Sequence, residues 1–196
     1  MSPEQQAKPA LRKYLRRKRQ ALAPAFRAQA ATAAAALAAG LPGWHTARHI
    51  AFYWPNDGEL DPRPLAAACR EQQRNLYLPV LAGDNRLIFR RWDADTTLPV
   101  NQFGIPEPQP GSPEPDTAEL DIVFLPLVGW QRDGYRLGMG GGFYDRTLAG
   151  PAGPLRVGMG FSCQELTGQM AERWDVALDY VLTETILHRC ADAECP

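Results

Sequence analysis

A glycine cluster follows an apolar run in the second half of the chain. Residues 122–128 are apolar and predict a buried strand, and a polar loop extends from Gly129 to Arg136. The glycines come next, at Gly138, Gly140, Gly141 and Gly142. Residues 143–148 are compatible with the first turn of a helix. A strand, a glycine turn and the start of a helix present free backbone N–H groups to an anion. The segment therefore predicts an anion-binding turn.

This turn carries neither of the two best-known phosphate signatures. No Gly-Lys-Ser or Gly-Lys-Thr follows, which excludes a Walker A loop, and Phe143 stands where GxGxxG needs its last glycine. Glycine adopts a positive φ without steric cost and lets ligand oxygens approach the main chain. A tight turn without a ligand is the simpler interpretation. Four glycines in five residues exceed what a turn needs, so the composition favours anion binding.

Three polar side chains adjoin the glycine turn. Asp145 either places a favourable negative charge at the positive end of a helix dipole or binds Mg²⁺ beside phosphates. Arg136 is either a bidentate phosphate clamp or an arginine that stabilises the loop. Tyr144 either lines a ligand pocket or packs. Spacing alone leaves these alternatives open.

An acidic turn follows the first predicted strand. Glu59 lies there between Asp57 and Asp61, and acidic residues are common in turns for structural reasons. A glutamate at the carboxyl end of a strand is also well placed to accept hydrogen bonds from a polar heterocycle. Trp54, five residues earlier, is either a stacking surface or the end of a core strand. The three histidines are scattered along the chain and build no catalytic triad.

The N-terminal part of the chain is strongly basic. From Lys8 to Arg27 there is no acidic residue, and all the lysines of the chain lie in this stretch. The spacing of Leu11, Leu15 and Leu22 predicts a helix there. Its basic face is compatible with a solvated surface, with nucleic-acid binding, or with one or two cations that reach a bound phosphate. Nucleic-acid binding is disfavoured because the net charge is -1 and no aromatic platform accompanies the basic run.

The composition is that of an ordinary globular protein. Hydrophobic residues make up 45% and charged residues 22% of the 196 residues, which suits one domain with a full core. We expect a single domain over residues 1–196, with loose ends at 1–7 and 190–196. No apolar run has the length of a membrane span and the N-terminus lacks an apolar signal core, so we expect a cytoplasmic protein. The four cysteines form no paired-ligand pattern, which argues for free thiols and against a zinc site.

Helical and strand patterns alternate along the chain. Helices are expected from Lys8 onward with Pro9 in the first turn, at Ala25–Ala39 and at Pro64–Gln73. Strands are expected at Arg48–Trp54, Leu76–Leu81, Arg86–Trp92, Ile122–Val128, Leu155–Phe161 and Tyr180–Thr185. This alternation is typical of an α/β fold, a single three-layer domain with a mostly parallel central sheet and helices on both faces. Ligands of such sheets bind at the carboxyl ends of the strands, which places Glu59, Glu107 and the glycine turn on one rim.

The chain resembles a known family at several ordered positions. The segment GYRLGMGGGFYDRTL, residues 134–148, resembles the signature of the 5-formyltetrahydrofolate cyclo-ligases, also called methenyltetrahydrofolate synthetases. Further elements similar to those of the family are Lys8–Arg12, Asp57–Asp61, Gly104–Pro108 and Trp174–Val176. Ordered matches along most of the chain make the resemblance much more specific than one glycine loop.

The resemblance implies a reaction and a set of site residues. ATP and Mg²⁺ would convert 5-formyltetrahydrofolate to 5,10-methenyltetrahydrofolate through an iminium phosphate, with release of ADP and phosphate. Arg136 and Asp145 would be catalytic, Asp145 and Asp175 would bind Mg²⁺, and Trp54 and Glu59 would contact the folate. The residues implied in ATP binding are Lys8, Arg12, Arg136, Leu137, Gly138, Met139, Gly140, Gly141, Gly142, Phe143 and Tyr144.

Two features leave alternatives: a departure from the family pattern in the glycine turn, and a basic N-terminal stretch in which the match of Lys8 and Arg12 could be out of register. Some members carry Arg or Lys within the glycine turn, where this chain has Met139 and Gly141. The missing charge would then come from Arg136 and the N-terminal helix, in which Arg16 or Arg17 could replace Arg12. A regulatory protein that binds folate or nucleotide without turnover is the alternative function. In either case we expect small-molecule partners, a monomer, and neither nucleic acid nor membrane as a partner.

Overall fold

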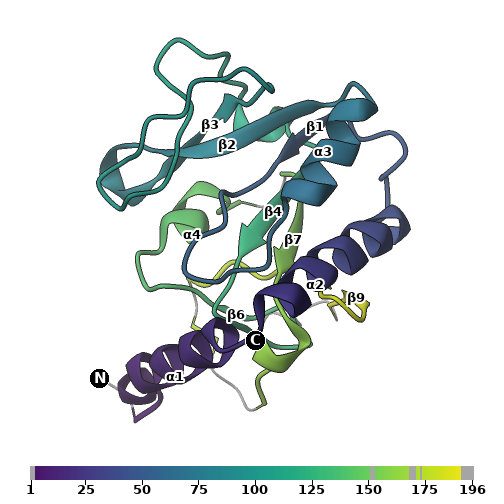
Figure 1. Ribbon diagram of the computed structural model, residues 1–196. Helices are drawn as coiled ribbons and strands as arrows, with labels where there is room; N and C mark the ends of the chain where they lie inside the picture. Colours follow the sequence, from purple (N-terminus) through teal and green to yellow (C-terminus); the bar gives the residue numbers. More distant parts are fainter. Residues whose placement is uncertain (1–2, 151–152, 168–170, 173, 191–196) are drawn as a thin grey trace.

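A mixed β-sheet forms the centre of the molecule (Figure 1). The computed structural model describes residues 3–150, 153–167, 171–172 and 174–190. Within these residues, seven strands form one sheet in the order β3-β2-β1-β4-β7-β8-β9. Its strands are β1 (His49–Ala51), β2 (Asn75–Leu81), β3 (Leu87–Arg91), β4 (Ile122–Pro126), β7 (Leu155–Met159), β8 (Tyr180–Leu182) and β9 (Leu187–Arg189).

The middle of this sheet is parallel and its edges are antiparallel. Strand β1 pairs in parallel with β2 and β4, β4 with β7, and β7 with β8. Strands β3 and β9 pair antiparallel at the two edges. The register places Ile50 opposite both Leu76 and Ile122, so apolar side chains of neighbouring strands lie side by side. The predicted α/β fold with a mostly parallel sheet is confirmed.

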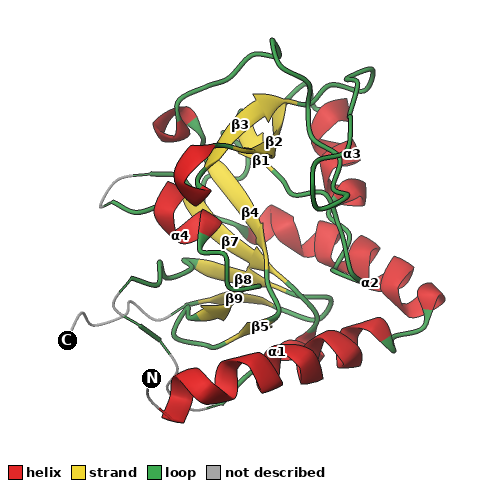
Figure 2. Cartoon of the chain, turned by 90° about the vertical axis from the view of Figure 1, so that its left-hand side faces the viewer, coloured by secondary structure: helices red, strands yellow, loops and turns green. Residues whose placement is uncertain are grey.

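Helices lie on both faces of the sheet (Figure 2). They are α1 (Pro3–Gln20), α2 (Pro24–Leu37), α3 (Arg63–Glu71) and α4 (Phe143–Thr147). Helices α2 and α3 pack on one face, where the small side chains of Ala30, Ala31 and Ala34 let α2 approach closely. The short helix α4 lies on the other face, over a second buried cluster that contains Leu148. None of the described helices is long and apolar enough to cross a membrane.

Two short strand elements are absent from the sequence-based prediction. A hairpin of β5 (Gly129–Trp130) and β6 (Arg136–Leu137) replaces the loop expected between the central strand and the glycine turn. Strand β9 extends the sheet beyond the last predicted strand. Strands of two or three residues are too short to display a period-two pattern, so propensity cannot reveal them. The hairpin matters for function because it delivers Arg136 and the glycine turn to the end of β4.

Helix α1 begins earlier than predicted. It starts at Pro3 and includes Pro9, so the loose end expected at 1–7 is wrong from Pro3 onward, and Pro9 does not lie in the first turn. Proline is favoured in a first turn, and the Glu, Gln and Ala that follow Pro3 are good helix formers. At the other end, Cys190 is buried and its backbone N–H donates to Asp179, so it is not loose. Residues 1–2 and 191–196 lie outside the described part of the chain.

A buried arginine fastens α1 to the sheet. The side chain of Arg19 is fully buried. Its Nε donates to the carbonyl oxygen of Asp57 at 2.9 Å, its Nη1 to that of Leu127 at 3.1 Å, and its Nη2 to Oδ2 of Asp57 at 2.9 Å. Asp57 follows β1 and Leu127 follows β4, so one guanidinium joins α1 to the ends of two central strands. The basic stretch is therefore not a uniformly solvated face.

We expect Arg19→Met to lower the free energy of unfolding by about 3 kcal/mol, because the change removes a buried cation and leaves Asp57 partly unpaired. Arg16→Met is the matched control. Arg16 also pairs with Asp57, but its side chain is 39% exposed, so its loss should cost below about 1 kcal/mol. Urea unfolding followed by circular dichroism measures both values. Equal losses in the two variants would contradict the anchoring role of Arg19.

Candidate active site

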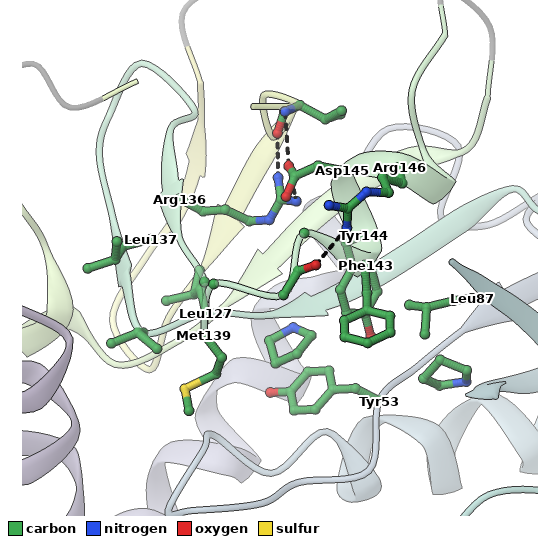
Figure 3. A pocket seen from close by; sticks show the side chains of 18 of the residues that line it. Tyr53, Leu87, Leu127, Arg136, Leu137, Met139, Phe143, Tyr144, Asp145 and Arg146 are labelled. Atoms are coloured by element: carbon green, nitrogen blue, oxygen red, sulfur yellow. Dashed lines mark hydrogen bonds and ion pairs between the residues drawn. The ribbon is translucent and has the colours of Figure 1, made fainter. Parts of the chain in front are cut away.

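One large cleft opens where the parallel strands end at their carboxyl side, and Figure 3 shows side chains that line it. Its volume is about 1160 Å³. The loops after β1, β2 and β4, the glycine turn and helix α1 all contribute to its walls. Arg16 and Arg17, the alternatives to Arg12, are not among the residues that line this cleft. The other site residues that the family resemblance implies all line it: Lys8, Arg12, Trp54, Glu59, Arg136, Leu137, Gly138, Met139, Gly140, Gly141, Gly142, Phe143, Tyr144, Asp145 and Asp175. The structure thus brings together residues that are up to 167 positions apart in the chain.

The glycine turn owes most of its glycines to backbone geometry and packing. Gly140 and Gly142 have φ values of 99° and 66°, in the region that side chains rarely adopt. A Cβ added at Gly141 would lie 2.6 Å from the Phe143 ring. The turn itself therefore needs Gly140, Gly141 and Gly142, and the prediction that its glycines exceed what a turn needs is wrong for these three. Helix α4 has only 5 residues, so its dipole contributes little and the turn depends on side chains for positive charge.

Helix α1 places two cations against this cleft. Arg12 donates from Nε to the carbonyl oxygen of Gly138 at 2.8 Å. Lys8 is nearly buried, with its Nζ 3.2 Å from Oε2 of Glu172 and 5.5 Å from the centre of the Tyr135 ring. Arg16, proposed as an alternative to Arg12, turns instead to Asp57 at 2.6 Å. Lys8 and Arg12 therefore both line the cleft, and their role in ATP binding stays a prediction.

The side chains of Arg136 and Asp145 point toward each other (Figure 3). Nη2 of Arg136 lies 2.7 Å from Oδ1 of Asp145, and Nη1 donates to the carbonyl oxygen of Val176. Oδ1 of Asp145 also accepts the backbone N–H of Val176 at 3.1 Å. Arg136 is buried and both of its terminal nitrogens are engaged within the protein. A bidentate phosphate clamp by Arg136 stays a prediction, and it would require these bonds to be exchanged.

Two carboxylates lie near one another beside the turn. Oδ2 of Asp175 accepts the backbone N–H of Glu172 at 2.8 Å. Burial raises the pKa of Asp175, the negative charge of Asp145 adds to this rise, and the Glu172 N–H opposes it. Among the described residues, no three His, Cys, Asp or Glu side chains are grouped as a complete metal site. A pair of carboxylates nevertheless fits Mg²⁺, which is usually held by one or two carboxylates together with phosphate oxygens.

Glu59, from the turn after β1, also lines the cleft. Oε2 of this residue accepts the backbone N–H of Asn56 at 3.0 Å, and Oε1 lies 3.6 Å from Nη2 of Arg19. Burial raises the pKa of Glu59 to about 7, against the opposing effects of the Arg19 charge and the Asn56 N–H. Near neutral pH this carboxyl group can therefore either donate or accept a hydrogen bond.

Trp54 lines the cleft together with Glu59. Its ring already contacts other side chains, which leaves less of its surface for stacking on a ligand. Its ring meets Trp92 edge-on with 6.0 Å between centroids. The guanidinium of Arg63 lies 5.4 Å from the centre of the Trp54 ring. Trp54 is half-buried and packs against the main core while it also lines the cleft. Strand β1 ends at Ala51, so Trp54 is not the end of a core strand. A stacking role for Trp54 stays a prediction.

Several cleft residues escape the sequence analysis. Arg19 and Tyr53 belong to the wall beside Glu59, Phe103 is an exposed aromatic residue at the rim, and Arg146 follows Asp145 in the glycine motif. Arg19 had a detectable signal, because it lies four residues after buried Leu15 on the same face of a helix. The other three lie in loops or in the last turn of α4, where no periodic pattern marks the side of the cleft.

These features define an α/β protein with a ligand cleft at the carboxyl ends of its parallel strands. Residues 4–184 match the model of the 5-formyltetrahydrofolate cyclo-ligase family. The chain is 42% identical over 141 residues to the 5-formyltetrahydrofolate cyclo-ligase of Haemophilus influenzae, covering 69% of this chain and 75% of that protein. Identity to the Escherichia coli K12 enzyme of the same name is 34% over 176 residues, covering 86% of this chain and 96% of the relative.

Solved structures lead to the same family. The Aquifex aeolicus 5,10-methenyltetrahydrofolate synthetase superposes with a TM-score of 0.83 and 30% identity, over 97% of this chain and 96% of that one. The Mycoplasma pneumoniae synthetase gives 0.72 and 27%, over 90% and 98%. The chain belongs to the 5-formyltetrahydrofolate cyclo-ligase family.

The raised pKa of Glu59 makes stability depend on pH. Its pKa rises from 4.5 to about 7 on folding, so its contribution is fully present below pH 4.5 and is lost as pH rises through 7. Arg19, Asp57 and Arg16 are the charged groups that face it. Relative to Glu59→Gln, the wild-type free energy of unfolding should fall between about pH 5 and 8, on the order of 3 kcal/mol. Chemical unfolding at several pH values measures this difference, and a pH-independent difference would contradict the raised pKa.

Proposed function

We propose that this protein catalyses the ATP- and Mg²⁺-dependent cyclisation of 5-formyltetrahydrofolate to 5,10-methenyltetrahydrofolate, with release of ADP and phosphate. The observation that carries the proposal is family membership over residues 4–184, together with a single cleft that contains all the expected site residues. The cleft volume of about 1160 Å³ lies above the range of roughly 300–1,000 Å³ that is typical of sites for one small molecule.

The chemistry needs positioning more than a protein nucleophile. The formyl oxygen attacks the γ-phosphorus, the bond to the β-phosphate oxygen breaks, and ADP leaves. N10 of the folate then attacks the activated carbon and loses its proton, and the carbon–oxygen bond breaks with loss of phosphate. Such phosphoryl transfer is accelerated mainly by alignment of the reactants and by stabilisation of the charge on the phosphoryl oxygens.

The cations and the backbone of the glycine turn would hold the nucleotide. Lys8 and Arg12 would bind phosphate oxygens from helix α1, and the turn from Arg136 to Tyr144 would bind them from the other side. Mg²⁺ would neutralise phosphate charge while held by Asp145 and Asp175. Support comes from the place of Arg12, whose guanidinium is hydrogen-bonded to the turn itself at Gly138.

Trp54 and Glu59 would contact the folate. Folate is a polar heterocycle with several donors and acceptors, and Glu59 is a buried carboxyl group poised between its two protonation states. We expect Glu59→Gln to impair the use of folate more than the binding of ATP. A mismatched buried partner costs about 1–3 kcal/mol, which corresponds to roughly 5- to 150-fold in the folate KM or in kcat. Steady-state kinetics with each substrate varied in turn would reveal it, and unchanged folate parameters would reject the assignment.

The overall reaction can be tested directly. Purified protein should form a product with methenyl absorbance from 5-formyltetrahydrofolate only when both ATP and Mg²⁺ are present. Removal of Mg²⁺ with a chelator should stop the reaction, and excess Mg²⁺ should restore it. Absence of product with every nucleoside triphosphate would contradict the proposed reaction. If calorimetry then showed tight folate binding without ATP hydrolysis, the non-catalytic binding protein would become the better interpretation.

Asp145 offers two variants that separate charge from structure. Asp145→Asn keeps an oxygen that accepts from Arg136 and from the Val176 N–H, but it removes the negative charge. We expect a loss of activity of at least about 100-fold with a folded protein. Asp145→Ala removes the acceptor as well, leaves the buried charge of Arg136 without its carboxylate, and should also lower the free energy of unfolding by about 3 kcal/mol. Turnover and urea unfolding measure these effects, and near-normal activity of the Asn variant would exclude a metal role.

A single chain would suffice for this reaction. All the residues assigned above line one cleft within one chain, so we propose a monomer that acts on small molecules in the cytoplasm. Sedimentation of the active protein in the presence of both substrates would test the monomer. An active species of twice the mass would contradict it.

A further inference from the structure

The glycine turn carries no cation of its own, yet two guanidinium groups pack against it. Arg12 comes from helix α1, and a Cβ added at Gly140 would lie 3.4 Å from its Cζ. Arg146 comes from helix α4, and a Cβ added at Gly142 would lie 2.8 Å from its Nη1. A Cβ at Gly140 would only touch the Arg12 guanidinium at van der Waals distance, whereas a Cβ at Gly142 would force the tip of the Arg146 side chain to shift. Both guanidinium groups therefore lie directly against the glycine turn.

Arg146 folds back over the turn from which its helix starts (Figure 3). Its Nη1 donates to the carbonyl oxygen of Gly141 at 2.6 Å. The residue is exposed and lines the cleft. Within the described residues it pairs with no carboxylate, in contrast to Arg136, which pairs with Asp145. A guanidinium has five N–H donors, so one bond to a carbonyl leaves most of its capacity for a ligand.

The charges around the turn favour an anion between the two arginines. Arg12 and Arg146 each bond a carbonyl oxygen of the turn, at Gly138 and Gly141. Neither bond neutralises a positive charge. Two cations held on the same short turn repel each other, and an anion that bonds to both would relieve this repulsion. A phosphate chain matches the planar fork of donors that a guanidinium presents.

We propose that Arg146 binds the phosphate chain of the nucleotide and forms a clamp with Arg12 across the glycine turn. The nucleotide is identified as ATP only through the proposed function, whereas the phosphate site itself rests on the geometry of the turn. Arg146 is thus the cation that the turn lacks at Met139 and Gly141, supplied from the helix that follows.

Charge-specific variants of Arg146 test this assignment. Arg146→Gln can still donate to the Gly141 carbonyl but has lost its charge, and Arg146→Lys keeps the charge. We expect the Gln variant to bind ATP and inorganic tripolyphosphate about 10- to 100-fold more weakly than the wild type, and the Lys variant to lie between them. Arg132→Gln is the matched control, because Arg132 is an exposed arginine paired with Glu165 away from the cleft. The control should bind as the wild type does.

A second-site variant separates a phosphate role from a structural one. Met139 is 57% exposed and lines the same cleft, so Met139→Arg can place a cation on the turn without disturbing the core. In the Arg146→Gln background, Met139→Arg should recover at least about tenfold in tripolyphosphate affinity. A merely structural role of Arg146 would not be rescued in this way. Failure of the rescue together with a loss of thermal stability in Arg146→Gln would overturn the proposal.

Calorimetry with ATP and with tripolyphosphate, carried out without folate, keeps this test independent of turnover. If the wild type binds both ligands through Arg146 but forms no methenyl product, the proposed function fails and the phosphate site stands. If the wild type is active and Arg146→Gln binds ATP and tripolyphosphate unchanged, the phosphate role fails and the function stands. A wild type that binds neither ligand overturns the phosphate role.

Discussion

The cleft depends on the buried guanidinium of Arg19. This group bonds the turn after β1 and the carbonyl of Leu127 after β4, and it lies 3.6 Å from Glu59. It therefore fixes the position of helix α1 relative to both walls of the cleft. Lys8 and Arg12 belong to the same helix, so their place beside the glycine turn follows from the docking of Arg19. A buried cation of this kind is stable only while its acceptors remain in place. The arrangement of the cleft therefore depends on the folding of the segments that carry Asp57 and Leu127.

The charges of the cleft fall into two groups. Inside the protein, cations are neutralised by neighbours: Arg19 by Asp57, Arg136 by Asp145, and Lys8 by Glu172. Arg12 and Arg146 instead bond only carbonyl oxygens of the turn, among the bonds that the described residues form. The first group stabilises the walls without a ligand. The second group keeps its charge available, and it lies on the turn that the sequence marks as the anion site.

The sequence predicts the central strand, the glycine turn and the parallel sheet because long apolar runs and glycine clusters are local signals. It also identifies residues that gather on one cleft, although mainly through ordered motifs rather than through spacing. The sequence does not predict which side chains form hydrogen bonds or ion pairs with those residues. Arg136 pairs with Asp145 because the β5–β6 hairpin reverses the chain, and that hairpin is too short to show a sequence pattern. Arg19 is buried while neighbouring basic residues of the same helix are exposed, and the composition of the stretch does not distinguish them. Such pairings are set by tertiary packing, which propensity does not encode.

The glycine turn takes its positive charge from the two helices beside it. Positive φ at Gly140 and Gly142 explains the turn, and the guanidinium groups of Arg12 and Arg146 lie against the same two positions. A cation within the turn would be fixed by the turn alone. Cations brought from α1 and α4 make phosphate affinity depend on how these two helices are docked. Loss of the α1 anchor should then weaken the phosphate site through Arg12 while leaving Arg146 in place, because Arg146 is held by its own helix and by Gly141.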